Sequence, residues 1–600
     1  MSARDAAVQA QDDAAYICAR VIDALLREDV RGCVSGARIV ESGAFAEGWD
    51  FPASQRWLEI GHWGAGRVWI PVVPERFMQS WRLARLPLLA EQDGTVRALA
   101  GLHAILARCA AGTDADTRSR FAAFEEECGV AIAHRAAAES ARRAWFGSDA
   151  PEPISGPWHR QMLRHDRLAS YLDHPLYPTA RAKLGFAVED LRRYAPEVSQ
   201  PFALHWLAVP RALVHGRDEQ LPPGWPAFPE VGLPQQLAAD HVLVPVHPFV
   251  WHGELAAMLA GAGLADRVIR APRTHMVVRP TLSVRSLALE HAPEWHVKLP
   301  LTIRTLGARN IRTIKPSTIH DGQLVQDLLA AIAAREPWLA GRLLLTREDT
   351  GAHVDGHTFL GYIVRRYPAA DLEESVPVPV AGLLAAAPEG GCVAEQLALR
   401  FYDGDLLALL QDYLELTLRL HLTLWLRYGI ALESNQQNSV LVLSSGERPR
   451  LRLLLKDNDA ARLWPARLER VSGPLAARLA DLQDARLRVD GELPLAQMFT
   501  TITLQLNLAV PIEGLARRVP GFRRDAAYAR VRQCIEAILA DCAAGGADIA
   551  LARQVLLQAD HLPVKYLLTA ATLLDKQVTG AADVNKFYGQ SAPNFLKPQP

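Results

Sequence analysis

Two polar segments flank a pair of short apolar stretches and could together hold a hard cation. Glu433 to Asn438 (ESNQQN) precedes residues 439–443, and Lys456 and Asp457 follow residues 451–455. The apolar stretches predict a β-hairpin, because a turn-rich link joins them. Its ends would bring Glu433, Asn438 and Asp457 together as oxygen ligands for Mg²⁺ beside a nucleotide. The alternative is a set of loop carboxylates in solvent.

Basic and hydroxyl side chains gather in a second region, residues 281–312. Ser283 and Arg285 are two residues apart on an expected strand over 281–289, so they share one face. His296 and Lys298 share a face of the next expected strand, 295–303, and Arg304, Thr305, Arg309 and Arg312 follow. Such a face could cradle a polyphosphate or a polycarboxylate. The alternative is a half-exposed sheet with its polar side turned to water.

The third candidate region is DHPLYPTARAKLGF at residues 173–186. Pro175 and Pro178 keep the chain extended or turned. Thr179 could then cap a helix that carries Arg181 and Lys183, and a helix start with nearby cations favours an anion. The alternative is a proline-bounded loop with solvated charges.

Composition excludes several classes of protein. The chain has 600 residues, is 50% apolar, and balances 65 Lys and Arg against 66 Asp and Glu, so no global positive field attracts nucleic acid. It has no P-loop, HExxH, GxSxG or zinc-ligand spacing. Seven scattered cysteines predict reduced buried thiols in a cytosolic protein. Neither a signal peptide nor a membrane span is expected, and residues 406–432 are interpreted as a buried amphipathic helix.

The elements that position these residues divide the chain into three parts. Residues 1–146 have mostly helical spacing, as at 13–27 and 95–111, with one strand at 67–73. The middle is dominated by strands whose links are too short for helical crossovers, which predicts a mostly antiparallel sheet. After residue 376 the helices return. The fold class is therefore α+β.

In this order, the segments resemble the IucA/IucC family, the NRPS-independent siderophore synthetases. The resemblance covers about residues 158–574. It rests on six motifs in sequence order: 173–185, PVHPFV at 245–250, SVRS at 283–286, KLPL at 298–301 with IRTI at 311–314, YGIALESNQQN at 428–438, and Lys456-Asp457.

The resemblance implies a hand-like protein with a thumb (1–155, mainly helical), β-rich fingers (156–375) and a largely helical palm with the hairpin (376–600). It implies that ATP and a carboxylic acid share a cleft, where the acid is adenylated and an amine or alcohol then attacks. By motif, ATP would contact Ser283, Arg285, Ser286, Lys298, Arg312 and Gln437. The acid would lie near His174, Arg309, Asn435 and Gln437, with catalysis by Arg312, Lys298, Asn435 and His174, and Mg²⁺ on Glu433, Asn438 and Asp457.

Three departures from the family pattern concern the acid. Tyr177 and Asn435 stand where the family has histidines, and Arg181 and Lys183 are exchanged. Asparagine cannot carry positive charge towards a carboxylate. A dicarboxylate such as α-ketoglutarate therefore competes evenly with citrate as the expected acid.

The resemblance also implies a cytoplasmic homodimer that takes small molecules and binds neither nucleic acid nor membrane. Alternative functions are those of a synthetase acting on a preformed citryl or succinyl intermediate, a ferric-siderophore-binding protein and an inactive homologue. Only Cys534 and Cys542 lie near the C-terminus, too few for an iron–sulfur cluster. Lys565, in the segment 561–574, either lines the entrance for the nucleophile or lies in solvent on an amphipathic helix.

Overall fold

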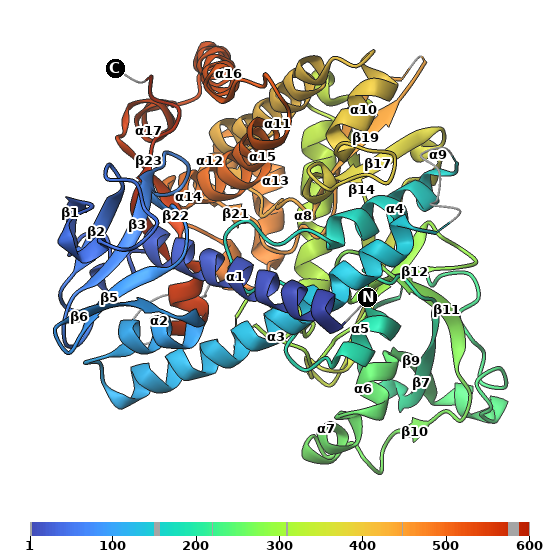
Figure 1. Cartoon of the computed structure of the whole chain (residues 1–600). Coiled ribbons are helices and arrows are strands. Elements are labelled where there is room, and N and C mark those ends of the chain that lie inside the picture. The colour runs from blue at the N-terminus through green and yellow to red at the C-terminus, as the bar shows by residue number, and fades with distance from the viewer. Residues whose placement is uncertain are drawn as a thin grey trace.

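The computed structural model describes residues 3–148, 156–218, 220–307, 310–446, 448–573 and 587–598. It is a mixed α+β fold with antiparallel sheets, as expected. Figure 1 shows the N-terminal region (blue), the middle of the chain (green) and the C-terminal helices (orange and red) as three masses around a central region.

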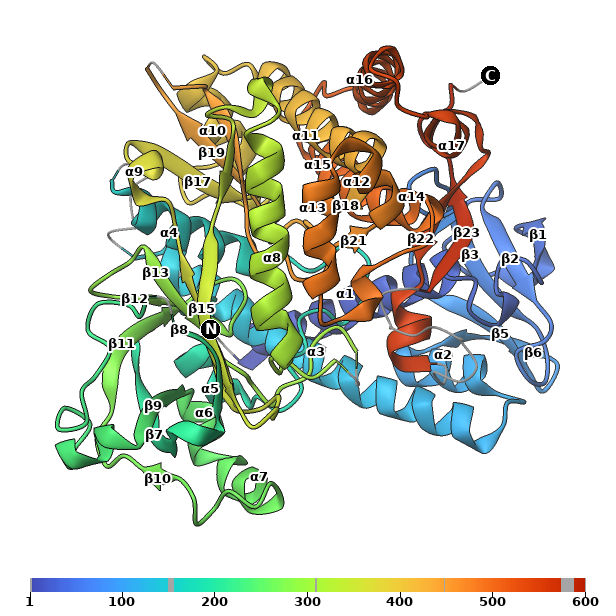
Figure 2. The same ribbon diagram turned by 180° about the vertical axis from the view of Figure 1, so that it is seen from behind.

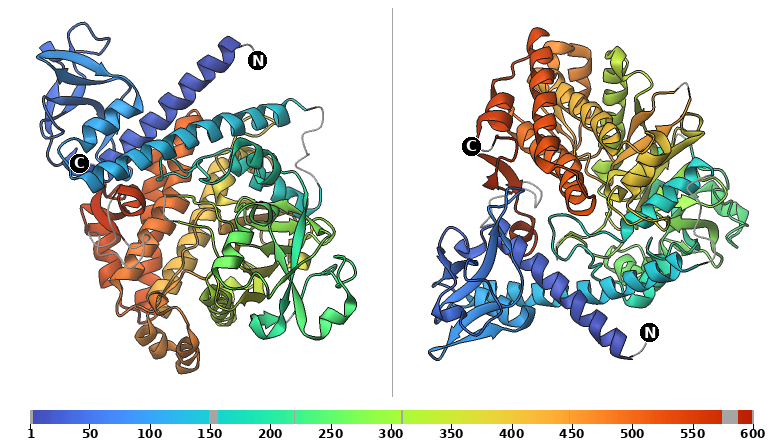
Figure 3. Two further views of the ribbon diagram at one scale, coloured as in Figure 1. Left: turned by 90° about the horizontal axis from the view of Figure 1, so that it is seen from below. Right: turned by 45° about the horizontal axis from the view of Figure 1, so that its top comes forward.

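The N-terminal region combines long helices with a six-stranded sheet. The helices are α1 (Ala3–Arg27), α2 (Gly101–Ala110) and α3 (Ala115–Phe146). The strands are β1 (Arg38–Glu41), β2 (Arg56–Ile60), β3 (Val68–Pro74), β4 (Trp81–Leu83), β5 (Leu88–Gln92) and β6 (Thr95–Leu99). Helices α1 and α3 pack against each other (Figure 3).

This sheet corrects the sequence analysis, which expected one strand here and a helix over 95–111. Residues 95–99 instead form β6, which pairs with β5 through a two-residue turn at Asp93 and Gly94. Both turn residues have positive φ, 50° and 74°, the conformation that Asp-Gly favours in tight hairpins.

The middle of the chain contains a nine-stranded sheet, all of whose paired strands are antiparallel. Its strands are β7 (Phe202–Pro210), β8 (Val214–Asp218), β9 (His241–Val246), β10 (Ile269–Arg270), β11 (His275–Pro280), β12 (Ser286–Leu289), β13 (Trp295–Lys298), β15 (Arg347–Val354) and β16 (Gly361–Arg366). Helices α4 (Trp158–Ser170), α5 (Val188–Tyr194), α6 (Pro248–His252), α7 (Leu255–Gly261) and α8 (Pro316–Ala333) belong to the same stretch of chain. The mostly antiparallel sheet expected for the fingers is thus confirmed.

Two expected strands are shorter than the sequence analysis proposed. Residues 281–285 form a turn, because Val284 has a φ of 65°, and β12 begins only at Ser286. Strand β13 ends at Lys298, two residues before Pro300. Ser283 and Arg285 therefore lie on a turn and not on one face of a strand.

The expected hairpin is confirmed as β19 (Ser439–Ser444) and β20 (Leu451–Leu455), which pair antiparallel with Ser439 opposite Leu455. Strands β14 (Leu343–Leu345) and β17 (Ser375–Pro379) extend it to four strands. The chosen boundary at 375/376 falls inside β17, and one hydrophobic core joins α8 to the C-terminal helices. The three-domain division therefore stays a prediction.

The C-terminal part is largely helical. Its main helices are α10 (Val393–Phe401), α11 (Leu406–Tyr428), α12 (Pro465–Val471), α14 (Leu493–Met498), α15 (Val510–Arg518) and α16 (Arg524–Ala544), with a π-helical segment at Phe499–Ala509. Strands β22 (His561–Lys565) and β23 (Tyr588–Pro593) form a separate pair. A last π-helical turn, Thr569–Leu573, packs into the N-terminal core through Leu573 and lies beside α3 in Figure 2.

Among the described residues, one helix, Leu493–Arg518, is long and apolar enough to cross a membrane. Within the fold, 89% of its apolar window is buried, as in the core helix of a globular protein. The stretch singled out from the sequence, 406–432, contains the buried helix α11, so that expectation is confirmed.

Candidate active site

A cavity of about 670 Å³ lies where the N-terminal region, the middle sheet and the C-terminal helices meet. The cavity is lined by one face of α1, the loop after α4, the 282–285 turn, residues 301–306, Arg312, the 435–437 loop and α15. Six of the residues predicted from sequence converge here, although they are far apart in the chain: His174, Ser283, Arg285, Arg312, Asn435 and Gln437.

The 281–285 turn presents Ser283 and Arg285 to this cavity. Thr281 donates its hydroxyl to the carbonyl of Ser286 at 2.7 Å, which closes the turn. From α4, the buried carboxylate of Asp166 accepts the Leu282 N–H at 3.1 Å. Asp166 was not predicted from the sequence, because its contact partner lies 116 residues away.

Arg285 and Arg312 form a cationic pair in the cavity wall. Nη1 of Arg285 donates to the carbonyl oxygens of Arg312 and Thr313 at 3.4 and 2.7 Å, and its buried Nε has no partner among the described residues. Neither side chain is in an ion pair within the described part of the chain. Burial, and then repulsion from Arg285, lowers the pKa of Arg312 to about 9. Two partly buried guanidinium groups with no carboxylate at ion-pair distance among the described residues favour an anionic ligand.

His174 lines the same cavity from the loop after α4, next to Arg20 of α1. Its Nδ1 accepts the backbone N–H groups of Leu176 and Tyr177, both at 3.2 Å, which leaves Nε2 as the donor of the neutral ring. Burial, and then the charges of Arg20, Lys565 and Arg27, lowers the pKa of His174 to about 3. His174 is therefore a neutral hydrogen-bond donor at ordinary pH.

The 433–438 loop supplies amide groups rather than charge. Oδ1 of Asn435 accepts the N–H groups of Gln437 and Asn438 at 3.0 and 3.2 Å, so its Nδ2 remains as a donor. The loop rests on the π-helical segment, where Asn507 donates to the Ser434 carbonyl at 2.7 Å. Asn435 and Gln437 line the cavity as neutral donors.

Lys298 and the expected metal ligands lie behind this wall and do not line the cavity. Nζ of Lys298 contacts Asp457 at 2.5 Å and Asp459 at 3.8 Å, and Arg365 contacts the same oxygen of Asp457 at 2.6 Å. Burial would raise the pKa of Asp457, but Arg365 and Lys298 hold it well below its usual value. Ser286 is buried in the same layer, 3.4 Å from the Ser283 hydroxyl.

Glu433 forms a separate ion pair with Lys565, at 3.3 Å. Lys565 is almost fully buried on β22, so the alternative that placed it in solvent on an amphipathic helix is wrong. In the parts of the chain that the structure describes, no three His, Cys, Asp or Glu side chains form a metal cluster. The Mg²⁺ set of Glu433, Asn438 and Asp457 stays a prediction.

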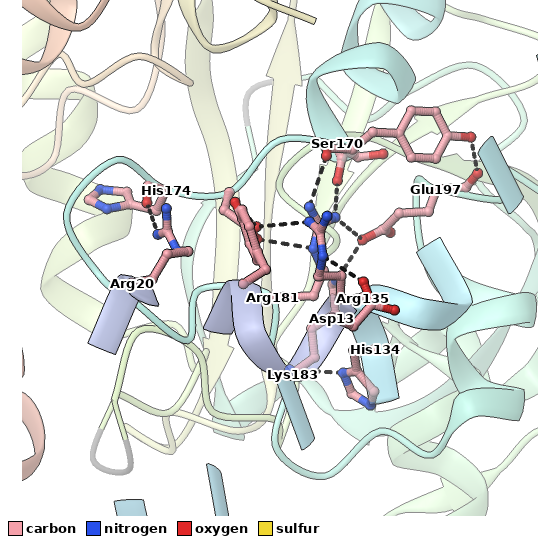
Figure 4. Close-up of polar contacts among 12 residues, drawn as sticks. Asp13, Arg20, His134, Arg135, Ser170, His174, Arg181, Lys183 and Glu197 are labelled. Carbon is pink, nitrogen blue, oxygen red and sulfur yellow. Dashed lines mark hydrogen bonds and ion pairs between the residues drawn. The ribbon is translucent and has the colours of Figure 1, made fainter. Parts of the chain in front are cut away.

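Arg181 and Lys183 do not form the anion site that the sequence suggested. Residues 179–183 form turns and not a helix, and the hydroxyl of Thr179 donates to Glu127 at 2.6 Å. Arg181 binds Asp173 at 3.1 Å, and Lys183 binds Glu197 at 2.7 Å (Figure 4). These buried carboxylates already neutralise both cations.

Arg181 and Lys183 line the cavity in this paired state, whereas Tyr177 does not line it. Its side chain is fully buried, and its hydroxyl donates to Glu127 at 2.8 Å and lies 2.8 Å from the Thr572 hydroxyl. It therefore links α3 to the C-terminal π-helical turn. Arg309, expected near the acid, lies outside the described residues.

Comparison with known proteins identifies two matching families. Residues 164–385 match the IucA / IucC family, and residues 407–579 match the family described as "Ferric iron reductase FhuF-like transporter". The second segment contains two cysteines, Cys534 and Cys542, fewer than the four thiolates that hold a typical iron–sulfur cluster.

Relatives and solved structures agree with the first match. Staphyloferrin B synthase of Staphylococcus aureus is 24% identical over 58% of this chain and 62% of its own. Petrobactin biosynthesis protein AsbB of Bacillus anthracis has a TM-score of 0.76 at 16% identity over 98% of this chain and 96% of that chain. ATP-bound aerobactin synthetase IucA of Klebsiella pneumoniae has a TM-score of 0.68 at 18% identity, covering 97% and 100%.

The sequence matches span about half the length of the curated relatives. At 16% and 18% identity, the two solved structures show the fold alone. Further relatives are named synthases or ligases.

Proposed function

We propose that this chain is an ATP-dependent siderophore synthetase of the IucA/IucC family, whose family model matches its residues 164–385. In this proposal it adenylates a carboxylic acid, citrate or α-ketoglutarate, with release of pyrophosphate. An amine or alcohol then attacks the acyl-adenylate, which gives an amide or ester and AMP.

The observation that carries the proposal is the pair Arg285 and Arg312. Adenylation brings an anionic carboxylate against the α-phosphate of ATP, and both groups repel each other before they react. Two guanidinium groups in the wall of a cavity of about 670 Å³, with no carboxylate at ion-pair distance in the described part of the chain, offset that repulsion and the charge that develops on the α-phosphate. Ser283 lies on the same turn as a hydroxyl donor.

In this proposal the acid binds a second, neutral set of groups that line the same cavity. His174 offers a neutral N–H, and Asn435 and Gln437 offer amide groups. These donors fix the orientation of carboxylate oxygens without adding charge, so Arg312 remains the cation that both ATP and the acid reach. This neutral set is as suitable for a dicarboxylate as for citrate.

After pyrophosphate leaves, the acyl carbonyl must remain oriented for the nucleophile. The N–H of His174 and the amide of Asn435 can hold the acyl group in place while a new C–N or C–O bond forms and the bond to AMP breaks. The nucleophile loses a proton, and AMP leaves as the phosphate anion next to Arg285 and Arg312.

Magnesium fits the chemistry of the residues expected to hold it. Glu433, Asn438 and Asp457 offer hard oxygen donors, and the hairpin register places Asn438 and Asp457 at the same end of β19 and β20. Lys298 and Arg365 both form their ion pair with Oδ1 of Asp457, so Oδ2 of this carboxylate is available to a cation. When bound, Mg²⁺ would neutralise phosphate charge and so favour loss of pyrophosphate.

A second candidate is a synthetase that takes a preformed citryl or succinyl intermediate. The cavity of about 670 Å³, lined by polar groups from both the N-terminal and the C-terminal parts of the chain, has room for such an intermediate. We also propose, from the family, a cytoplasmic homodimer.

The test is ATP-dependent pyrophosphate release with hydroxylamine as nucleophile and citrate, α-ketoglutarate or succinate as acid. Release with one of them supports the proposal. If the protein uses none of these acids but does use a citryl or succinyl intermediate, the second candidate replaces the first. No pyrophosphate release with any of these compounds would favour a binding protein or an inactive homologue.

A further inference from the structure

One face of helix α1 borders the acid side of the cavity. Tyr16, Arg20, Asp23 and Arg27 all line it, at the spacing of a single helix face. The face is not a surface of solvated charges, because each of these side chains contacts a neighbouring segment. Leu83 N–H, for example, donates to Asp23 at 2.8 Å.

The two arginines on this face bind the loop that carries His174. Arg20 donates to the carbonyl oxygens of His174, Tyr177 and Pro178 at 2.6, 2.8 and 3.0 Å. Arg27 donates to that of Leu176 at 2.8 Å. Figure 4 shows the guanidinium of Arg20 beside His174. Two guanidinium groups from the N-terminal helix therefore hold four carbonyls of one short loop.

The loop needs such partners, because residues 173–178 form no helix or strand. Its carbonyls have no ladder to enter, and unpaired polar groups at a buried site are costly. Tyr16 adds a further contact from the same helix face, donating to Asp173 at 2.9 Å. The position of His174 thus depends on a helix about 150 residues earlier in the chain.

The ATP side of the cavity has a different support. The 281–285 turn is held by Thr281 and by Asp166 of α4, and neither side chain is hydrogen-bonded to α1 among the described residues. A change in α1 should therefore disturb the acid side and leave the ATP side intact.

We propose that Arg20 is a positioning residue for the acid substrate, which it serves by holding the loop that presents the Nε2–H of His174. The N-terminal helix is thereby part of the acid-binding site. This inference rests on the proposed function.

The kinetic test compares Arg20→Met and Arg20→Lys with the wild type. Lysine keeps the charge but not the fork that spans three carbonyls. Both variants should raise KM for the acid by about tenfold or more, which corresponds to the loss of one charge-assisted hydrogen bond, while KM for ATP stays within about twofold. Arg38→Met, which removes an exposed arginine of the same region, should change neither constant.

An unchanged acid KM in both variants, or equal rises in the acid and ATP constants, would overturn the proposal. If Arg20→Met fails to fold, Tyr16→Phe removes one contact of the same face and should raise only the acid KM, by a smaller factor.

A second readout does not require turnover. The amides of Leu176 and Tyr177 donate to Nδ1 of His174, and Arg20 holds the loop in which they lie. In Arg20→Met the loop should open more often, so hydrogen exchange at these two amides, measured on the full chain, should be faster than in the wild type. Unchanged exchange at these amides would contradict the proposed role of Arg20. If no acid is turned over by the wild type, the proposed function fails, and the exchange result still decides whether Arg20 holds the loop.

Discussion

Arg285 and Arg312 share one wall of the cavity, and the charge of Arg285 contributes to lowering the pKa of Arg312 to about 9. The side chain of Arg285 also donates to the main-chain oxygen of Arg312 at 3.4 Å, so the two residues are held next to each other. Asp457 and Asp459 attract both guanidinium groups, but burial outweighs them and lowers the pKa of each arginine, so the charged pair makes the free protein less stable than it need be. The ligand is the natural counter-ion.

The first prediction is that Arg312→Met stabilises the free protein. The side chain makes no hydrogen bond or ion pair among the described residues, and burial and repulsion from Arg285 outweigh its attraction to Asp457 and Asp459, so its removal should be favourable. The free energy of unfolding should rise by about 1 kcal/mol. Urea unfolding measures this, with the exposed Arg192→Met as control.

The same variant should lose the stabilisation by ATP. At 100 times Kd, ATP should add about 2.7 kcal/mol to the wild type and far less to Arg312→Met. A variant that is less stable without ATP yet gains as much from ATP as the wild type would contradict the anion-binding role.

The second prediction concerns His174→Asn. The Asn oxygen can replace Nδ1 as acceptor of the Leu176 and Tyr177 amides, whereas the Nε2–H is lost. Stability should therefore stay within about 0.5 kcal/mol, and the acid KM should rise roughly tenfold. Steady-state kinetics with the acid and with ATP varied separately test this. Equal loss of both affinities would argue against an acid-specific role.

Much of the site could be predicted from the sequence, because its motifs lie at the ends of elements with clear patterns. The 439–455 hairpin and the long helix 406–428 were recognisable from apolar spacing, and they fix the 433–438 loop between them. Asp93-Gly94 was a hairpin signal that could have revealed the N-terminal sheet.

Other features were beyond sequence patterns because they depend on distant partners. Arg181 and Lys183 resembled free cations, since nothing local indicates their pairing with Asp173 and Glu197. The 281–285 turn was mistaken for a strand because Val284 adopts a φ that β-branched residues rarely take. The Arg20 contacts span about 150 residues and have no sequence signature.

The third prediction is that Tyr177→Phe affects stability and not substrate choice. Its hydroxyl is buried against Glu127 and Thr572, and the other carboxylate oxygen of Glu127 already lacks a partner among the described residues. Removal should cost about 1–3 kcal/mol and leave the acid KM within about twofold. A shift in acid preference without loss of stability would instead make Tyr177 a specificity residue.

The fourth prediction is that stability falls with acidification below pH 6.5. Burial lowers the pKa of six histidines to about 3 or 4: His134, His165, His174, His205, His247 and His421. Below their ordinary pKa of 6.5 the unfolded chain binds protons that the folded chain does not. The stabilisation is therefore complete above pH 6.5 and is lost as the pH falls towards 4.

His421→Leu tests that account, because burial alone lowers the pKa of His421 to about 4. Between pH 6 and 4.5 the variant should lose about 1.4 kcal/mol less per pH unit than the wild type. The exposed His103→Gln should keep the wild-type slope. Identical slopes for all three proteins in urea unfolding would show that His421 is not buried in its neutral form.

The central claim, that the chain activates a carboxylic acid with ATP, is tested most directly by pyrophosphate release with hydroxylamine and each candidate acid. The account predicts release that requires ATP, depends on citrate or α-ketoglutarate, and is lost in Arg285→Met and Arg312→Met. Release that is independent of any acid, or that survives in both variants, would contradict it.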